Sequence, residues 1–436
     1  MADEIEEHFL ARQTELAFHR TRLRFDLARS VFASAGIDPG SLLLLRYLQS
    51  LPLAGGERVL DLGCGHGTLG LTLQALDPSR RIVSVDRDAL ALRYTSRNLA
   101  LNELPADRHR ILGSLGYDAL PRPRALGSPE AADADHADDG RFDLIVSNIP
   151  GKAGEAVIAE LIGRACAFGH PGTTIGIVVV TPLREQVTAL VEDLGLECVL
   201  RKGNKHHEVF ILRAADGVDE RPPTSAPAFA AGVYDRHQQR FMAGSLTWDA
   251  TTVVGLDEFD SLSYATRLLR TALQGIASGP SLVVEPGQGH RAVIAAIAGY
   301  PPSALLSRDR LALEASNRML VTAGADEPEL VHDLTVEAVP GFDGGSPPPV
   351  VIFHAPEKVH GPWLVDQIEH IIATFRASDH GRPCDLVLIG RAGPLGRLES
   401  DVLARRSGHV AHKRSERGFR ALRFRVTPAA HGAAGA

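Results

Sequence analysis

Short unbroken runs of apolar residues alternate with longer segments of mixed polarity along most of the chain. In the first half these runs are VLDL (59–62), IVSV (82–85), DLIVSN (143–148), TIGIVVV (174–180) and EVFIL (208–212). Continuous runs of Val, Ile and Leu are typical of parallel strands that helices cover on both faces. Because such strands alternate with helices, the pattern predicts a doubly wound α/β fold.

Two segments depart from this pattern. Leu, Phe and Val recur at helical spacing in TELAFHRTRLRFDLARSVF, so residues 5–50 are predicted to be helical. Residues 119–140 are rich in Ala, Asp, Pro and Gly without any period, and they predict a flexible surface loop.

The apolar pattern occurs twice. VLDLGCGHGTLGL (59–71) has an echo in LVVEPGQGHRAVI (282–294), IVSVDRDALALRYTSRNLALN (82–102) in LLSRDRLALEASNRMLVTA (305–323), and IVSNIPGKAGEAV (145–157) in VIFHAPEKVHGPW (351–363). The echoes stay in order before and after the loop at 119–140. We therefore predict two tandem Rossmann-like units that arose by duplication.

A register for the repeat follows from the echoes. It pairs Asp38 with Asp257, Gly63 with Gly287, Asp61 with Glu285, Gly67 with Arg291, Asp86 with Ser307, and Asn148 with His354. Several polar or small residues of the first copy are therefore replaced in the second. We expect the second copy to be degenerate and not to bind the ligand of the first.

These patterns divide the chain into five predicted parts. They are a helical leader and lid segment at 1–50, a first α/β domain at 51–215, a linker at 216–229, a degenerate second domain at 230–427 and a disordered tail at 428–436. A Pro-Pro pair within a Ser/Ala/Pro-rich stretch indicates the linker.

Composition narrows the class of protein. No run approaches 18 apolar residues, so no membrane span is expected. The N-terminal MADEIEEHFLARQ lacks the basic start and apolar run of a secretory signal. The four cysteines have no paired or metal-ligand spacing, which favours a reducing cytoplasm and predicts no metal site: Cys64, Cys166, Cys198 and Cys384.

The net charge of −7 argues against broad electrostatic coating of nucleic acid. The basic run Arg405–Arg420 is the candidate for a local patch that faces a polyanion, and a simple solvated face is the alternative.

The sequence DLGCGHG places Gly63, Gly65 and Gly67 between a strand and a helix. Glycines let the backbone turn sharply and come close to a ligand. Asp61 lies at the strand end before them, and Asp86 ends the next strand. A carboxylate there would repel a pyrophosphate but would attract a cationic amino-acid ligand.

This combination resembles motif I of class I S-adenosylmethionine-dependent methyltransferases. The resemblance implies that S-adenosylmethionine is the cofactor and that the glycine loop, with Asp61, wraps its methionine part. It implies further that Asp86 holds the ribose hydroxyls and that Ser114 lies where the family contacts adenine.

FDLIVSNIPGKAG places Asn148, Ile149 and Pro150 after an apolar strand. This is similar to the N-P-P-aromatic motif of amino-group methyltransferases, with Ile149 and Gly151 at the positions of the first Pro and the aromatic. The resemblance implies that the Asn148 side chain and the next carbonyl accept hydrogen bonds from a planar amine, so that orientation and proximity supply the rate.

The segment SVFASAGIDPGSLLLLRYLQSL (30–51) resembles the segment before motif I in the "methyltransferase small domain" family, which includes two-domain ribosomal RNA guanine-N2 methyltransferases. The resemblance places Asp38 and Ser41 over the cofactor and substrate pocket. Phe32 is a ring that could substitute for the missing aromatic, and Lys152 could face an anionic substrate group or simply be solvated.

The resemblance predicts transfer of a methyl group to an exocyclic amine of an RNA base, of the rRNA guanine-N2 type. Asn148 and Pro150 would orient the acceptor, and ribosomal RNA or a ribosomal subunit would be the partner. Two alternatives stay open. One is N-methylation of a small-molecule amine or a protein side chain, and the other is a non-catalytic scaffold that binds S-adenosylmethionine.

Overall fold

The computed structural model describes residues 7–53, 55–123, 140–214, 226–342, 346–355, 361–378, 383–401, 403 and 408–428. Most of the predicted loop at 119–140, most of the predicted linker at 216–229 and almost all of the predicted tail at 428–436 lie outside these residues. The chain divides into two compact units, here called the first unit (Ala2–Tyr234) and the second unit (Asp235–Ala436).

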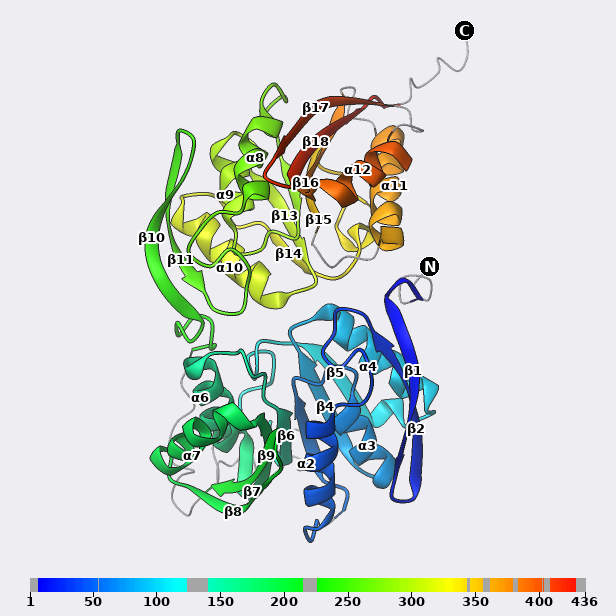
Figure 1. Cartoon of the computed structure of the whole chain (residues 1–436), viewed down its shortest axis with the longest axis vertical. Helices are drawn as coiled ribbons and strands as arrows, with labels where there is room; N and C mark the ends of the chain where they lie inside the picture. The colour runs from blue at the N-terminus through cyan, green and yellow to red at the C-terminus, as the bar shows by residue number, and fades with distance from the viewer. Residues whose placement is uncertain are drawn as a thin grey trace. The chain divides into compact units, whose positions relative to one another are not determined.

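The first unit is built on a seven-stranded mixed sheet (Figure 1). Its strands are β3 (Arg58–Leu62), β4 (Arg81–Asp86), β5 (His109–Gly113), β6 (Phe142–Asn148), β7 (Gly169–Val180), β8 (Leu196–Gly203) and β9 (His207–Ala214). They lie in the order β5-β4-β3-β6-β7-β9-β8. Strands β3 to β7 are parallel, and β9 and β8 continue the sheet antiparallel.

The chain runs outward from β3 to β5 and then returns to β6 on the other side of β3. A reversal of this kind leaves a crevice at the carboxyl ends of the central strands, where α/β proteins bind ligands. Two clusters of buried residues, one on each face of the sheet, hold the helices in place. The helices are α2 (Pro39–Gln49), α3 (Thr68–Leu76), α4 (Ala89–Leu101), α6 (Glu155–Gly163) and α7 (Arg184–Asp193).

The predicted helical leader is wrong over most of its length. Strand β1 (Leu10–Phe18) pairs antiparallel with β2 (Thr21–Ala28). Among the described residues of the segment 5–50, the helical ones are residues 7–9 and those of α2. The apolar side chains alternate with polar ones, which is the period of a strand rather than a helix. The buried set is Leu16, Phe18, Leu23, Phe25 and Leu27.

The second unit repeats this plan. A hairpin, β10 (Asp235–Ala243) with β11 (Leu246–Val253), precedes a seven-stranded sheet in the order β14-β13-β12-β15-β16-β18-β17. The strands are β12 (Ser281–Val284), β13 (Pro302–Ser307), β14 (Glu329–His332), β15 (Val350–Ala355), β16 (Cys384–Arg391), β17 (His409–Glu416) and β18 (Phe419–Val426). The helices are α8 (Tyr264–Leu273), α9 (His290–Ile297), α10 (Arg310–Thr322), α11 (Gly361–Ala377) and α12 (Ala392–Asp401).

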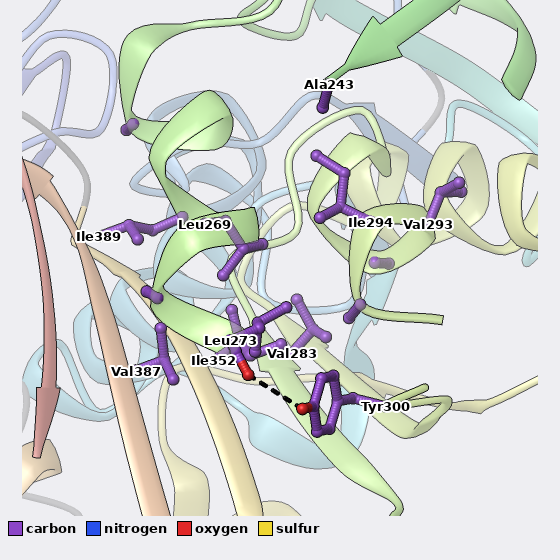
Figure 2. Close-up of a cluster of buried hydrophobic side chains, with 14 of the residues drawn as sticks. Ala243, Leu269, Leu273, Val283, Val293, Ile294, Tyr300, Ile352, Val387 and Ile389 are labelled. Carbon is purple, nitrogen blue, oxygen red and sulfur yellow. Dashed lines mark hydrogen bonds between the residues drawn. The ribbon is translucent and has the colours of Figure 1, made fainter. Parts of the chain in front are cut away.

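A core of aliphatic side chains holds this second unit together (Figure 2). Leu269 and Leu273 of α8 pack near Val387 and Ile389 of β16. The Tyr300 hydroxyl donates a hydrogen bond to the carbonyl of Leu273 at 2.9 Å. The second copy therefore keeps a full core, whatever its function. None of the helices among the described residues is long and apolar enough to cross a bilayer.

Helix caps correct the start of the repeat register. Asp38 caps α2 by accepting from the amide of Ser41, and Ser263 caps α8 by accepting from the amide of Thr266. The hairpins show the same offset, because Ala28 ends β2 and Val253 ends β11. Asp38 therefore corresponds to Ser263, and its predicted pairing with Asp257 is wrong.

Backbone conformation corrects the glycine loop in the same way. Left-handed φ values at Gly63, Gly65 and Gly67 (77°, 57° and 82°) recur at Glu285, Gly287 and Gly289 (55°, 64° and 109°). Gly63 therefore corresponds to Glu285, and Gly67 is retained as Gly289 rather than replaced by Arg291.

The strand ends show which polar groups the second copy has lost. Leu62 pairs with Val85 as Val284 pairs with Leu306, which places Asp61 with Val283 and not with Glu285. The same strand registers keep Asp86 with Ser307 and Asn148 with His354, as the sequence register had them. The second copy therefore lacks both carboxylates and the amide.

Candidate functional site

The loop between β3 and α3 leaves part of its backbone open. A Cβ added at Gly63 or Gly65 would meet no atom of the described residues within 4 Å. A Cβ at Gly67 would instead lie 2.7 Å from Cδ1 of Leu71. The first two glycines therefore keep space beside the loop for a ligand, whereas Gly67 allows α3 to pack closely.

Two carboxylates lie against this loop. Asp61 Oδ2 accepts a hydrogen bond from the amide of Gly70 at 2.9 Å. Its Oδ1 is buried and has no hydrogen-bond partner among the described residues. Asp86 accepts from the amides of Gly65 at 2.9 Å and Asp88 at 3.0 Å. Asp86 therefore joins the end of β4 to the glycine loop.

Burial makes both carboxylates costly to ionise. Burial, with a smaller contribution from the nearby charge of Asp86, raises the pKa of Asp61 to about 7, although the hydrogen bond from the Gly70 amide opposes the shift. Burial also raises the pKa of Asp86 to about 6. No cation of the protein pairs with Asp61 among the described residues. Two such acids beside an open loop form a site that favours a cationic ligand.

Ser114 supports the loop after β5. Its amide donates to the Asp86 carbonyl at 2.8 Å. Its hydroxyl donates to the Gly116 carbonyl at 2.8 Å and accepts from the amide of Ala119 at 2.9 Å. These bonds fix a turn beside Asp86, and the predicted contact of Ser114 with adenine stays a prediction.

The β1–β2 hairpin is tied to the back of the glycine loop by residues that the sequence analysis missed. The amide of Ala28 donates to Nε2 of His66 at 2.8 Å. Burial lowers the pKa of His66 to about 4, so the ring is neutral and can accept. Asn98 donates to the carbonyls of His66 and Asp26, both at 3.0 Å.

Each of these anchoring hydrogen bonds has a counterpart in the second unit. A comparison of the two copies in the sequence could therefore have pointed to the anchoring residues. The amide of Val253 donates to Oε1 of Gln288 at 2.9 Å, as Ala28 does to His66. Thr95 and Ser316 each donate a hydroxyl to the carbonyl of the middle glycine of their loop, at 3.0 and 3.2 Å. An alignment of the two copies in the correct register pairs His66 with Gln288 and Thr95 with Ser316.

Asn148 lies at the carboxyl end of β6 with its amide in a defined orientation. Its Nδ2 donates to Oδ2 of Asp38 at 2.8 Å and to Oγ of Ser41 at 3.0 Å. Since both amide hydrogens are directed at these two acceptors, Oδ1 faces the other way and keeps its acceptor capacity. The structure thus brings Asp38, Ser41 and Asn148 together.

The residues after Asn148 take different positions. The side chain of Ile149 is buried in the core, so only its main chain could contact a substrate. Pro150 and Lys152 are exposed. The roles predicted for these three residues stay predictions.

His207 is a further residue that the sequence analysis did not place at the site. It begins β9, and its ring lies over Gly40, where an added Cβ would be 2.8 Å from Cδ2 of His207 and 2.9 Å from Oδ2 of Asp38. Its Nδ1 is buried without a hydrogen-bond partner among the described residues. The glycine at position 40 therefore makes room for an imidazole beside Asp38.

The corresponding crevice of the second unit is filled by its own side chains. Glu285, which stands in place of Gly63, accepts from the hydroxyl of Ser307 at 3.1 Å and from the amide of Arg308 at 3.2 Å. Its side chain thus crosses from the loop to the end of β13. The open backbone of the first unit has no equivalent here.

A buried ion pair lies beside Glu285. Arg291 approaches Glu258 at 3.4 Å and donates to the carbonyl of Glu285 at 3.1 Å. Burial by itself would raise the pKa of Glu258, but Arg291 and the donors Ser263 and Thr266 hold the pKa below its usual value. The first unit has Ala33 and Leu69 at the positions of Glu258 and Arg291. These side chains support the expectation that the second copy does not bind the ligand of the first.

The basic run Arg405–Arg420 is largely compensated where the structure describes it. Lys413 and Arg420 pair with Glu399 at 2.8 and 3.2 Å, and Arg414 lies 3.9 Å from Glu416. This pattern favours a solvated, internally paired face over a patch that faces a polyanion.

Residues 22–121 match the family model of the methyltransferase small domain. The ribosomal RNA small subunit methyltransferase C of Stutzerimonas stutzeri is 44% identical over 92 residues, 21% of this chain and 26% of that protein. The protein of the same name from Pseudomonas putida is 36% identical over 117 residues, 27% of this chain and 33% of that protein. The chain therefore matches between a quarter and a third of these relatives' length.

Among solved structures, the T. thermophilus 16S rRNA N2 methyltransferase RsmC, in complex with AdoMet and guanosine, is similar along the chain. The similarity covers 97% of this chain and 100% of that one, with a TM-score of 0.61 and 16% sequence identity. The predicted resemblance to the methyltransferase small domain family is confirmed for residues 22–121. The predicted fold of two tandem Rossmann-like units is also confirmed.

Proposed function

We propose that the chain is an S-adenosylmethionine-dependent N-methyltransferase that acts on an exocyclic amine of an RNA base, of the rRNA guanine-N2 type. Catalysis is assigned to the first unit. The observation that carries the proposal is the orientation of Asn148, whose amide nitrogen is held by Asp38 and Ser41 beside the open glycine loop.

The residues of the first unit fit the cofactor. Gly63 and Gly65 leave a cradle that a Cβ would enter, and the buried Oδ1 of Asp61 has no partner among the described residues. Asp61 and Asp86 would hold the cationic methionine part and the ribose. When bound, S-adenosylmethionine supplies an electrophilic methyl group on a sulfonium sulfur.

Asn148 positions the acceptor. Its Oδ1 accepts a hydrogen bond from the planar amine, which directs the nitrogen lone pair towards the methyl group. The amine nitrogen would take up the methyl group that the cofactor supplies, and the extra amine proton would then leave to solvent. Because the nucleophile is a neutral amine, orientation and proximity carry most of the rate, and no strong base is needed.

Supporting observations come from the names of the relatives, which are ribosomal RNA methyltransferases. Ribosomal RNA or the small ribosomal subunit is the proposed partner. The four free cysteines support a reducing compartment, and we infer a cytoplasmic location.

A second candidate is N-methylation of a small molecule or a protein side chain. The net charge of −7, the internally paired basic run and Gly151 after Pro150 favour it. The cofactor and the residues that bind it would be the same for both candidate functions, so only the identity of the methyl acceptor distinguishes them.

The test uses isothermal calorimetry with S-adenosylmethionine and then transfer of a labelled methyl group to RNA, protein and metabolite fractions. Asp86→Ala should abolish binding, while Ser307→Ala, the matched change in the second unit, should leave it unchanged. Label in RNA supports the proposal, and label only in metabolites or protein supports the second candidate. Binding without any transfer would instead indicate a scaffold.

A further inference from the structure

The lysines of the first unit all lie at one edge of its sheet. Only five of the 46 lysine and arginine residues of the chain are lysines, and those of the first unit are Lys152, Lys202 and Lys205, here called the basic rim. Lys152 follows the end of β6, Lys202 lies near the end of β8, and Lys205 lies in the turn between β8 and β9. Because β6, β7 and β8 run in the same direction, their carboxyl ends meet at the edge that carries Asn148.

The β8–β9 turn is fixed beside the end of β7. Oδ1 of Asn204 accepts hydrogen bonds from the amides of His206 and His207 at 2.8 and 2.9 Å. Thr181, which directly follows β7, donates its hydroxyl to the carbonyl of Lys205 at 3.2 Å and its amide to the carbonyl of His206 at 2.9 Å. These bonds hold Lys205 next to the carboxyl end of β7.

The other two lysines flank this position. Lys152 follows Gly151, where an added Cβ would lie 3.1 Å from Cγ2 of Val180, the last residue of β7. Lys202 lies opposite Val209 in the β8–β9 ladder. Residues directly opposite each other share a face of the sheet. Val209 belongs to the buried cluster that packs against α2, so Lys202 lies on the α2 face.

The basic rim carries positive charge that the protein does not compensate. All three lysine side chains are exposed, and none of them forms an ion pair or a side-chain hydrogen bond with the described residues. Acids of the neighbouring elements are already engaged, because Glu208 of β9 lies 2.9 Å from Arg201 and Glu185 of α7 lies 2.9 Å from Arg184. The three charges are therefore available to an external anion.

The second unit uses the corresponding charges internally. Strand pairing aligns its β17–β18 turn with the β8–β9 turn and places Arg414 and Arg417 at the positions of Lys202 and Lys205. Arg414 lies 3.9 Å from Glu416, and the guanidinium of Arg417 lies 5.3 Å from the centre of the Tyr264 ring. The uncompensated lysines thus belong to the unit with the open glycine loop.

We propose that the basic rim binds the phosphate backbone of a single-stranded RNA next to the acceptor nucleotide. This proposal rests on the proposed function and deepens it, because the substrate becomes an RNA strand rather than a free nucleoside. The sheet order places Asn148 of β6 between the glycine loop after β3 and the rim at β7 to β8. A strand held by the rim therefore presents its base to Asn148 from the side away from the cofactor loop.

The chemistry of the rim suits this ligand. Lysine is a compact charge on a flexible stem and binds phosphate without a fixed geometry. Contacts of this kind set the register of a strand and carry no sequence information. The strand has to be single at the acceptor, since an enzyme that reacts with a base takes it out of the stack.

The salt dependence of RNA affinity tests the rim without any catalysis. The parent protein and Lys202→Gln/Lys205→Gln are titrated into a fluorescently labelled single-stranded RNA at several salt concentrations, and anisotropy reports binding. Loss of two phosphate contacts should lower the slope of log affinity against log salt by about 1.4. The same loss should weaken binding roughly 10- to 100-fold at about 50 mM salt.

The matched control is Arg414→Gln/Arg417→Gln in the second unit, which should leave the slope unchanged. The lysine variant should keep the thermal stability and the S-adenosylmethionine affinity of the parent, because its replaced side chains are exposed and unpaired. A second RNA of unrelated sequence should lose affinity by the same factor. An unchanged slope in the lysine variant, an equal fall in the arginine control, or a loss confined to one sequence would overturn the proposal.

Methyl transfer separates the rim from the proposed function. In an RNA-methylating protein, Lys202→Gln/Lys205→Gln should raise the KM for RNA by the factor by which it weakens binding. Label in RNA with an unchanged KM would refute the rim alone. A slope that depends on the two lysines in a parent protein that labels no RNA would refute the proposed function and support the rim as an RNA-binding surface.

Discussion

The side-chain amide of Asn148 donates a hydrogen bond to the carboxylate of Asp38, 110 residues earlier in the chain, at 2.8 Å. The same Asp38 oxygen accepts from the amide of Ser41 at 2.8 Å and so begins helix α2. One carboxylate therefore both starts a helix and orients the amide at the end of β6. Helix capping and acceptor positioning can be separated by substitution.

Asp38→Ser should separate these two roles. Serine is as good a helix cap as aspartate, so we expect the free energy of unfolding to change by less than about 0.5 kcal/mol. The shorter side chain does not reach Asn148, and kcat should fall about 100-fold because the acceptor is misplaced. Thermal unfolding and single-turnover methyl transfer measure the two effects.

The matched control is Ser263→Ala, which removes the cap of α8 in the second unit. It should cost about 1 kcal/mol of stability and leave kcat unchanged. A fully active Asp38→Ser variant would show that Asn148 does not need Asp38.

The contribution of Asp61 and Asp86 to the stability of the ligand-free protein should fall as the pH rises from 4 to 7, against the opposite contribution of buried neutral histidines such as His66. The pKa values of Asp61 and Asp86 are raised to about 7 and about 6 from 3.8, so the folded state holds more protons than the unfolded state in this range. The stabilisation from the two protonated carboxyl groups is complete below their pKa in the unfolded chain. It is lost as the pH rises through their pKa values in the folded protein. Asp61→Asn should remove the share of Asp61, so that the free energy of unfolding of the variant rises more steeply with pH than that of the parent, and denaturant titrations of both proteins at several pH values would measure this difference. An unchanged slope would contradict the assignment to Asp61.

Binding of S-adenosylmethionine should release protons below pH 7. A cationic ligand favours the ionised carboxylates, so affinity should rise with pH, approaching tenfold per unit while one carboxylate is protonated. Calorimetry in two buffers with different ionisation enthalpies measures the released protons. Equal apparent enthalpies at pH 6 would count against the prediction.

The ion pair between Glu258 and Arg291 should be replaceable, without a large loss of stability, by Ala and Leu, the residues found at these positions in the first unit. Glu258→Ala or Arg291→Leu alone leaves an unpaired buried charge and should cost about 3–5 kcal/mol. The double variant has the residues that Ala33 and Leu69 provide in the first unit, and it should recover most of that loss. A double-mutant cycle by chemical denaturation measures the coupling. Additive losses would show that the two charges do not interact.

Gly63→Glu should block cofactor binding while the first unit still folds. The second unit carries Glu285 at this position in the same left-handed conformation, so the fold tolerates the residue at about 1–2 kcal/mol. Gly172→Glu is the matched control, since Gly172 has φ 84° and open space around it in the N-terminal part of β7. Calorimetric binding by Gly63→Glu equal to that of the control would disprove the cradle.

The parallel sheets and the glycine loop could be predicted because their signals are local and strong. The β1–β2 hairpin could not, because its turn at His19 carries no Gly, Pro or Asn, although φ at His19 is 50°. The corresponding β10–β11 hairpin turns at Gly244, where φ is 65°, and the glycine there is a clearer sequence signal for a turn. Two short strands with apolar residues in alternation also match helical spacing when they are read as one segment.

The register error has a simple cause. The glycines of the loop recur every second residue, so a shift by two still places Gly63 on Gly287 and Gly65 on Gly289. Backbone φ values and caps remove this ambiguity, and neither is visible in the sequence. The contacts of Asn148 and His207 were hidden for another reason, since their partners lie on α2, far away along the chain.

The filled crevice of the second unit also bears on evolution. Restoring an aspartate at Ser307 would place a second acid beside Glu285, and removing Glu285 alone would leave Arg291 and Glu258 in the cavity. No single replacement opens the loop of the second unit, and a variant that keeps one partner of the buried ion pair would be less stable than the parent. Opening the second unit to a ligand would therefore require several coordinated replacements rather than one, because Glu285, Arg291 and Glu258 hold one another in place.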